Sequence, residues 1–375
     1  MDTKSRQSHT KRIERKGFTL VELLVVITII GILAALITAA GVGALKKARQ
    51  TRIKVELDQI AEAIQLTGAF PPNCQVDDTP GTSSTNPIDE SQVLVDVQRY
   101  VKQLATKYAE PQTLVWALTG DTTNAGAATG NALKGGMSAG EALVFWLSGV
   151  SSDPKLPFSG EGGPSYPIPS IGAADNYTLD PIESRKWVFP FDVARLQPRR
   201  PDNYFDETKG RFIEYTVRIN GVNQFRRINF WQYVPPKSTQ PFLYFDTSRH
   251  PAAVISGGNA FGPFDPPAAT ALSGLGLHIH PIKIRNSVFR PGQDEGIVAP
   301  IEFANRDKFQ ILNCGVDDQW GEEAFELMSA HGVAEAMRDP RKLESYLIFP
   351  DGPFTGDVAD TLTNFSEGTP EDAQP

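Results

Sequence analysis

A long apolar run defines the N-terminal part of the chain. From Phe18 to Ala40 the only ionisable side chain is Glu22. As a helix rising about 1.5 Å per residue, this run would be roughly 34 Å long, enough to cross a bilayer core of about 30 Å. The pattern predicts a transmembrane segment at 18–40 with one carboxylate near its start.

The helix is expected to continue over residues 41–66. Apolar residues recur there at the spacing of one helix face, and charged residues occupy the other positions. This stripe consists of Ile53, Leu57, Ile60 and Ile64. Gly41 and Gly43 each lower helix propensity by about 1 kcal/mol, so the helix could bend or melt there. Residues 41–66 are therefore predicted to form an amphipathic stem.

Residues 67–350 are predicted to form an α+β head that is rich in loops and strands. A Pro-, Gly- and Ser-rich stretch ends the stem, and apolar periodicity then predicts a helix over 93–104. Ser138-Ala139-Gly140-Glu141 has the form of a capping box, which places a second helix start at Ser138. A last helix is expected over 322–337.

The strongest strand signal lies in the second half of the chain. The run from Ile213 to Ile219 alternates apolar and polar residues, and a second strand-like run covers 222–234. Asn220-Gly221 between them predicts a tight hairpin, because both residues accept positive φ. Further strands are expected at 241–245 and 308–312. Residues 351–375 carry six acidic side chains and no basic one, which predicts a mobile tail.

Charge is distributed unevenly along the chain. The net charge is −8, but residues 1–17 carry six basic and two acidic side chains, and residues 67–375 carry a net charge of −13. A nucleic-acid surface needs clustered Lys and Arg, so the acidic head argues against nucleic acid as a partner. The acidity does not by itself identify a partner.

The junction before the apolar run carries the most specific motif, Arg15-Lys16-Gly17-Phe18-Thr19-Leu20-Val21-Glu22. It resembles the N-terminal signature of type IV prepilins and type II secretion pseudopilins. The resemblance makes residues 1–17 a basic leader, with cleavage after Gly17 by a prepilin peptidase and methylation of the new N-terminal Phe18. It assigns Glu22 to assembly, where its carboxylate would neutralise the α-amino group of a neighbouring subunit.

Two simpler interpretations compete with this resemblance. A secretory signal peptide has a shorter apolar region, followed by a small-residue cleavage site. A plain single-pass anchor explains the hydrophobicity but not the Gly-Phe-Thr-Leu-Val-Glu motif. Basic residues flank both ends of the span, so the positive-inside rule barely decides the orientation. A cytoplasmic N-terminus therefore follows from the resemblance alone.

Two motifs are considered as catalytic or metal sites and set aside. Gly136-Met137-Ser138-Ala139-Gly140 fits the pattern of a hydrolase nucleophile elbow, but the residues before it do not form a strand, and Ser138 already serves as an N-cap. His278 and His280 share one strand face, yet a zinc site needs further ligands that the sequence does not place nearby. We expect no enzyme.

The loop after the 308–312 strand is the candidate metal site. Asp317 and Asp318 lie in Gly315-Val316-Asp317-Asp318-Gln319-Trp320-Gly321, which resembles a late loop of pseudopilin heads that binds Ca²⁺ in some members. The alternative is an Asp-rich turn. The chain has two cysteines, Cys74 and Cys314. They either form a disulfide or remain two separate thiols, and the sequence leaves both alternatives open.

The sequence thus predicts a pilin-like α+β subunit in the bacterial inner membrane, with its head in the periplasm. The large head favours a minor, tip or adaptor role in a type II secretion or type IV pilus-like filament. Expected partners are the prepilin peptidase, other pilin-like subunits, the inner-membrane assembly platform and a secreted substrate. The alternative function is a pilin-anchored binding module that recognises a substrate, glycan or surface.

Overall fold

The computed structural model describes residues 19–73, 90–119, 133, 136–172, 180–198, 211–249, 252, 254–256, 259–261, 281–288, 301–320, 348–352, 354 and 356–373. The chain forms two compact units, Met1–Arg49 and Gln50–Pro375. We call them the N-terminal unit and the head unit. The predicted helix at 322–337 lies outside the described residues.

Helix α1 (Leu20–Leu66) is continuous, so the helix persists through Gly41 and Gly43. In the N-terminal unit its large apolar side chains are exposed, for example Leu20 at 80% and Leu45 at 73%. Among the described residues it is the one helix long and apolar enough to cross a membrane, and none of its most apolar window is buried. By length and composition α1 can cross a membrane, and the bounds 18–40 of the span stay a prediction.

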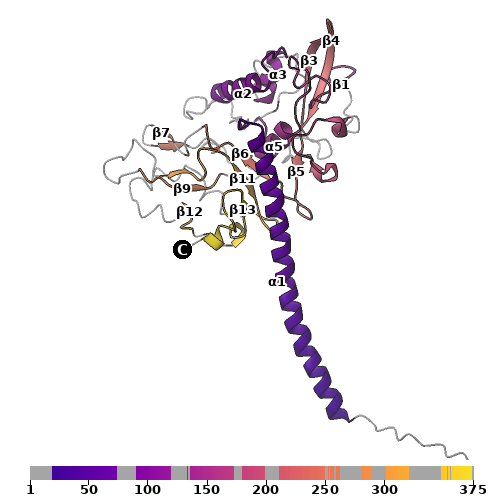
Figure 1. The fold of residues 1–375 in the computed structure, drawn as a ribbon, viewed down its shortest axis with the longest axis vertical. Coiled ribbons are helices and arrows are strands. Elements are labelled where there is room, and N and C mark those ends of the chain that lie inside the picture. The colour runs from indigo at the N-terminus through magenta and orange to yellow at the C-terminus, as the bar shows by residue number, and fades with distance from the viewer. Residues whose placement is uncertain are drawn as a thin grey trace, which may run out of the picture. The chain divides into compact units, whose positions relative to one another are not determined.

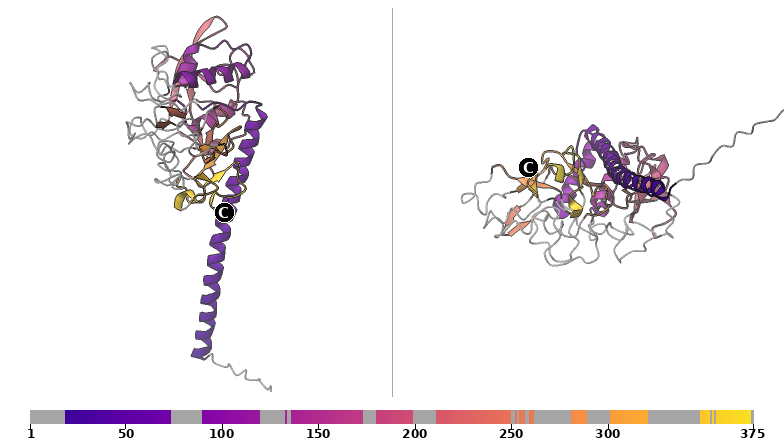
Figure 2. Two further views of the ribbon diagram at one scale, coloured as in Figure 1. Left: turned by 90° about the vertical axis from the view of Figure 1, so that its left-hand side faces the viewer. Right: turned by 90° about the horizontal axis from the view of Figure 1, so that it is seen from below.

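The last part of α1 belongs to the core of the head unit. Ile53, Leu57, Ile60 and Ile64 are all buried, which confirms the predicted stripe. They pack in a cluster with residues of α5, β6, β11 and β13, and Figures 1 and 2 show these elements beside the final turns of the helix. The chain leaves the helix through Pro71 and Pro72, whose carbonyl oxygens accept hydrogen bonds from the Tyr244 hydroxyl at 2.7 Å and the Trp146 indole at 3.1 Å.

The other helices in the part of the chain that the structure describes are short. They are α2 (Glu90–Leu104), α3 (Gln112–Leu118) and α5 (Ala139–Leu147), with 3-10 turns at Ile182–Ser184, Val193–Arg195, Gly356–Val358 and Glu371–Ala373. The predictions of α2 and of the helix start at Ser138 are confirmed, whereas α3 was not predicted. Every residue of α5 is buried, because its two sides serve two different apolar clusters. A helix that is apolar on every side, apart from its capping residue Glu141, is expected to lie inside a protein.

The strands of the described residues form five small sheets. One sheet has the order β1 (Tyr166–Ile168), β4 (Val222–Asn229), β3 (Phe212–Ile219). The second has the order β10 (Ile301–Phe303), β9 (Lys283–Arg285), β12 (Ile348–Phe349), and the third has β13 (Leu362–Thr363), β11 (Gln310–Asn313), β6 (Leu243–Phe245). Two pairs remain, β2 (Leu196–Gln197) with β5 (Gln232–Tyr233) and β7 (Val254–Ser256) with β8 (Asn259–Phe261).

The predicted hairpin is confirmed in its register. Ile219 pairs with Val222 across the turn, and Asn220 and Gly221 have φ of 52° and 83°. The second strand ends at Asn229 rather than at residue 234, and β5 begins after a break. Strands at 241–245 and 308–312 are also confirmed, as β6 and β11.

The prediction of a mobile tail over 351–375 is wrong for the described residues. Leu362 pairs with Asn313 and is only 1% exposed, and Phe354 is buried. The Lys54 ammonium in α1 donates to the Thr363 carbonyl oxygen at 2.8 Å. The head therefore extends past residue 350, because a few apolar side chains find partners supplied by β11 and α1.

Candidate functional site

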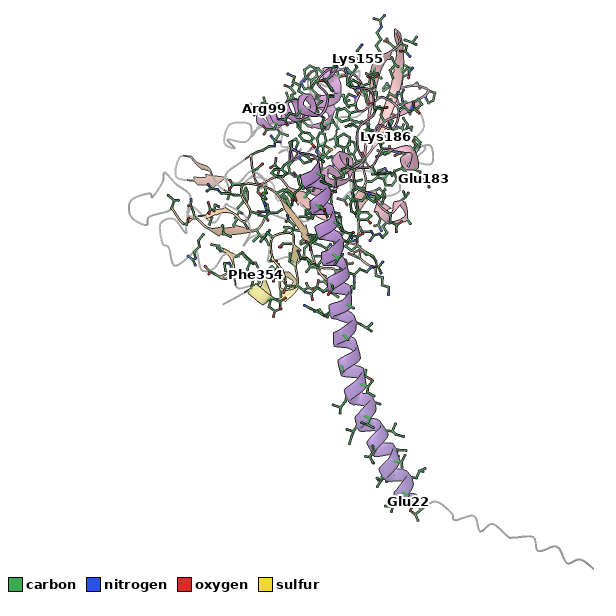
Figure 3. The ribbon with its side chains drawn as sticks, viewed as in Figure 1. Glu22, Arg99, Lys155, Glu183, Lys186 and Phe354 are labelled. Carbon is green, nitrogen blue, oxygen red and sulfur yellow. The ribbon has the colours of Figure 1, made fainter. Side chains whose placement is uncertain are left out.

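The first turn of α1 holds the candidate assembly residue. Thr19 precedes the helix, and one oxygen of the Glu22 carboxylate accepts hydrogen bonds from the Thr19 backbone N–H and hydroxyl, both at 2.8 Å. The Glu22 backbone N–H donates in return to the Thr19 hydroxyl at 3.2 Å. This reciprocal arrangement is a capping box, which satisfies donors that a helix start otherwise leaves free. Figure 3 shows Glu22 at the start of the helix.

The remaining polar side chains of the span are satisfied within the helix. The Thr38 hydroxyl donates to the Ala34 carbonyl oxygen at 2.8 Å, and the Thr28 hydroxyl donates to the Leu24 carbonyl oxygen. A membrane offers no water to such groups, so internal partners suit a lipid environment. Gly17 and Phe18 lie outside the described residues, so the predicted cleavage point stays a prediction.

The structure brings Cys314, Asp317 and Asp318 together in one loop after β11. Asp318 has φ of 65°, a left-handed conformation that Gly, Asn and Asp adopt most readily. This requirement accounts for an Asp at a position where the resembling loops often have Gly. The Asp317 carboxylate accepts the Gln319 backbone N–H at 3.0 Å, as in an Asx turn.

The Asp318 carboxylate ties this loop to the turn before β6. It accepts from the Thr239 backbone N–H and hydroxyl, each at 2.7 Å, from the Gln240 backbone N–H at 3.3 Å, and from the Ser238 hydroxyl. Partial burial alone would raise the pKa of Asp318, but the hydrogen bonds from Ser238, Thr239 and Gln240 lower it overall. Both oxygens of this carboxylate thus already serve a structural contact.

Asp360 is a carboxylate that the sequence did not single out. One of its oxygens accepts the Val316 backbone N–H at 2.8 Å and the Asp317 backbone N–H at 3.3 Å, while Oδ1 is buried without a hydrogen-bond partner. Calcium requires six to eight oxygen ligands. Among the described residues, however, there is no group of three or more His, Cys, Asp or Glu side chains arranged to hold a metal. The calcium site therefore stays a prediction from the sequence.

Cys314 is a buried free thiol. Burial raises the pKa of Cys314 far above its usual range, and the nearby carboxylates of Asp318, Asp317 and Asp360 raise it further. A thiol in this environment is held neutral and is a poor nucleophile. Cys74 lies outside the described residues, so a disulfide between the two cysteines stays a prediction.

Ser138 acts as the predicted N-cap of α5. Its hydroxyl accepts the Glu141 backbone N–H at 3.3 Å, and the Glu141 carboxylate accepts the Ser138 backbone N–H at 2.9 Å. The same carboxylate receives the Arg211 guanidinium at 2.8 Å in a buried ion pair. The Ser138 side chain is thus part of a structural network. His278 and His280 lie outside the described residues.

A second buried carboxylate, Glu110, was missed by the sequence analysis. It accepts the backbone N–H groups of Phe158 at 2.6 Å and Ser159 at 2.8 Å, and the Ser159 hydroxyl at 2.8 Å. The Tyr215 hydroxyl lies 2.6 Å from the Ser159 hydroxyl. Burial raises the pKa of Glu110 to about 7, although the hydrogen bonds from Ser159 and Phe158 and the charge of Arg226 oppose the rise. No local pattern marks such a residue, because its partners come from distant segments.

Comparison with known proteins gives one match. Residues 14–38 match the family described as the prokaryotic N-terminal methylation motif, whereas no curated protein and no solved structure matches the chain. The chain therefore carries the type IV prepilin and pseudopilin signature. With its apolar N-terminal helix and β-rich α+β head, it fits a single-pass, membrane-anchored, pilin-like subunit.

Proposed function

We propose that this chain is a minor, tip or adaptor subunit of a type II secretion or type IV pilus-like filament. The observation that carries the proposal is the methylation motif at residues 14–38, which continues directly into the exposed apolar part of α1. Cleavage after Gly17 would create an α-amino group beside apolar surface. The Glu22 carboxylate of a neighbouring subunit is the group that can neutralise it.

The size of the head supports a minor role. The head unit begins at Gln50 and continues to the end of a 375-residue chain, and such bulk is more than repeated packing along a filament needs. In this proposal, the head lies in the periplasm and the N-terminus lies in the cytoplasm. The inner-membrane assembly platform and other pilin-like subunits are the partners, and a secreted substrate is a further candidate.

Quantifying the subunit in sheared filaments tests the role. We expect a low copy number relative to the most abundant subunit, with cross-links concentrated at one filament end. Uniform, high-copy incorporation along the filament would exclude a tip or adaptor role and indicate a major subunit. Complete absence from filaments, with the head still displayed on the membrane, would favour the alternative of an anchored binding module.

A further inference from the structure

A group of basic side chains follows the apolar part of α1. After Glu22 the next ionisable residue is Lys46, and no acidic residue occurs before Glu56. Between these limits the helix carries five basic residues. The first four lie within about two helical turns, and we call them the basic collar; they are Lys46, Lys47, Arg49 and Arg52.

The basic collar surrounds the helix. Successive α-helical residues are turned by about 100°, so Lys47, Arg52 and Arg49 project about 100°, 240° and 300° from Lys46. Lys46, Lys47 and Arg52 are exposed, and Arg49 is half-buried. A single protein partner would contact one face of the helix, whereas lipid headgroups surround a transmembrane helix on every side.

The depth of the basic collar also matches a headgroup layer. Uncharged residues continue from the predicted span through Leu45, so Lys46 is the first side chain able to reach a phosphate. From Lys46 to Arg52 the helix rises by about 9 Å, close to the 5–8 Å of the interfacial layer on one side of a bilayer. Long side chains on a helix lean toward its N-terminus, which here is the direction of the membrane.

We propose that the basic collar binds the phosphate groups of anionic phospholipids in the leaflet nearest the head. Each Lys or Arg at an anionic surface strengthens binding by about fivefold. Residues 67–375 carry a net charge of −13 and would be repelled by such a surface, whereas the positively charged collar would be attracted to it. The collar would fix the depth of the helix, and the subunit would have to release these lipids to leave the membrane.

This proposal does not depend on the orientation of the span or on leader cleavage. If the head were cytoplasmic, the collar would meet the other leaflet with the same chemistry. Basic residues that follow the span run against the usual charge bias for an exported segment. Lipid binding gives these charges a role that insertion alone does not provide.

Native mass spectrometry of the full-length, detergent-solubilised protein tests the proposal. The probes are phosphatidylglycerol and phosphatidylcholine at equal concentration, and the measurement is the ratio of the two lipids retained. One variant removes the collar charges through Lys46→Gln, Lys47→Gln, Arg49→Gln and Arg52→Gln. A matched variant makes the same charge change on exposed lysines of the head, among them two labelled in Figure 3, through Lys102→Gln, Lys107→Gln, Lys155→Gln and Lys186→Gln.

We expect the wild type and the head variant to retain phosphatidylglycerol at least tenfold over phosphatidylcholine, and the collar variant to show a several-fold weaker preference than the head variant. All three proteins keep the leader, so its six basic residues give the same background preference in each. Equal retention of the two lipids by the wild type would overturn the proposal. A preference in the collar variant as strong as that of the head variant would also overturn it, and cross-links from Lys46 or Lys47 to acidic residues of a second copy would then identify the collar as a subunit contact.

Discussion

The carboxylate of Glu22 and the hydroxyl and backbone N–H of Thr19 form a closed capping box at the first turn of α1. Glu22, which the prepilin signature assigns to assembly, therefore also caps the start of α1. The two roles of Glu22 can be tested separately, because Gln keeps the acceptor oxygen of Glu but not its charge.

Glu22→Gln should therefore insert into the membrane and start the helix normally but enter filaments poorly. Glu22→Val should insert at least as well as the wild type, since it removes an ionisable group from lipid, and should also assemble poorly. Glu22→Asp should be intermediate, because the charge remains while its reach is shorter. The measurement is the amount of each variant in sheared filaments divided by its amount in membranes.

Thr19→Ala is the matched control, since it weakens the cap by about 1 kcal/mol and keeps the carboxylate. We expect Thr19→Ala to assemble nearly as well as the wild type. If Glu22→Gln assembled normally while Thr19→Ala did not, the cap rather than the charge would be what assembly requires.

Processing is expected to depend on the size of residue 17. Gly17→Ala should be cleaved partially and Gly17→Arg should remain uncleaved, because a peptidase that acts after Gly17 needs close approach to the backbone. Mass spectrometry of the mature N-terminus should find methylated Phe18. An intact leader in a host with an active prepilin peptidase would contradict the proposed function.

Substitution of Asp317 and of Asp318 distinguishes a structural role of their loop from calcium binding. Asp318→Ala should lower the stability of the protein by about 1.5–3 kcal/mol with or without calcium, because Thr239 and Gln240 lose a charged acceptor. Thermal unfolding with and without millimolar CaCl2 is the measurement. If the loop binds calcium, as the sequence predicts, calcium should raise the Tm of the wild type and Asp317→Ala should abolish the rise. An unchanged Tm in the wild type would contradict the prediction of a calcium site.

Glu110 should make stability depend on pH. Its pKa is 4.5 as a free side chain and about 7 in the fold, so the folded state holds this proton more tightly than the unfolded state. The resulting stabilisation is fully present below pH 4.5 and is lost as pH rises to 7. At 1.36 kcal/mol per pH unit the loss is about 3 kcal/mol at most.

Glu110→Gln removes this titration and provides the comparison. Denaturant unfolding of both proteins between pH 4 and 8 should show the wild type losing stability relative to the variant as pH rises. A constant difference between the two proteins over this range would mean that the three hydrogen bonds offset the effect of burial, so that Glu110 has the same pKa in the folded and unfolded states.

Cys314 should resist alkylation until the protein unfolds, because burial and three neighbouring carboxylates keep its thiol neutral. Recovery of a peptide that links Cys314 to Cys74 from a non-reducing digest would instead establish the disulfide alternative.

The sequence alone determined the features that depend on residues close together in the chain, such as an apolar periodicity, a helix cap or a tight turn. The apolar run, the stripe from Ile53 to Ile64, the cap at Ser138 and the Asn220-Gly221 hairpin all rest on residues a few positions apart. The Thr19–Glu22 box has the same local form as Ser138–Glu141 and was open to the same reasoning.

Only the tertiary structure decided the features whose partners are remote. Strand β13 contains just Leu362 and Thr363, too few to show a period, and it exists because β11 offers an edge. Glu110 reads as an ordinary surface acid until Ser159 and Tyr215 enclose it. Burial of an isolated apolar pair or of a carboxylate is favourable only when distant segments supply the contacts and donors, and the residues around each position in the sequence do not contain that information.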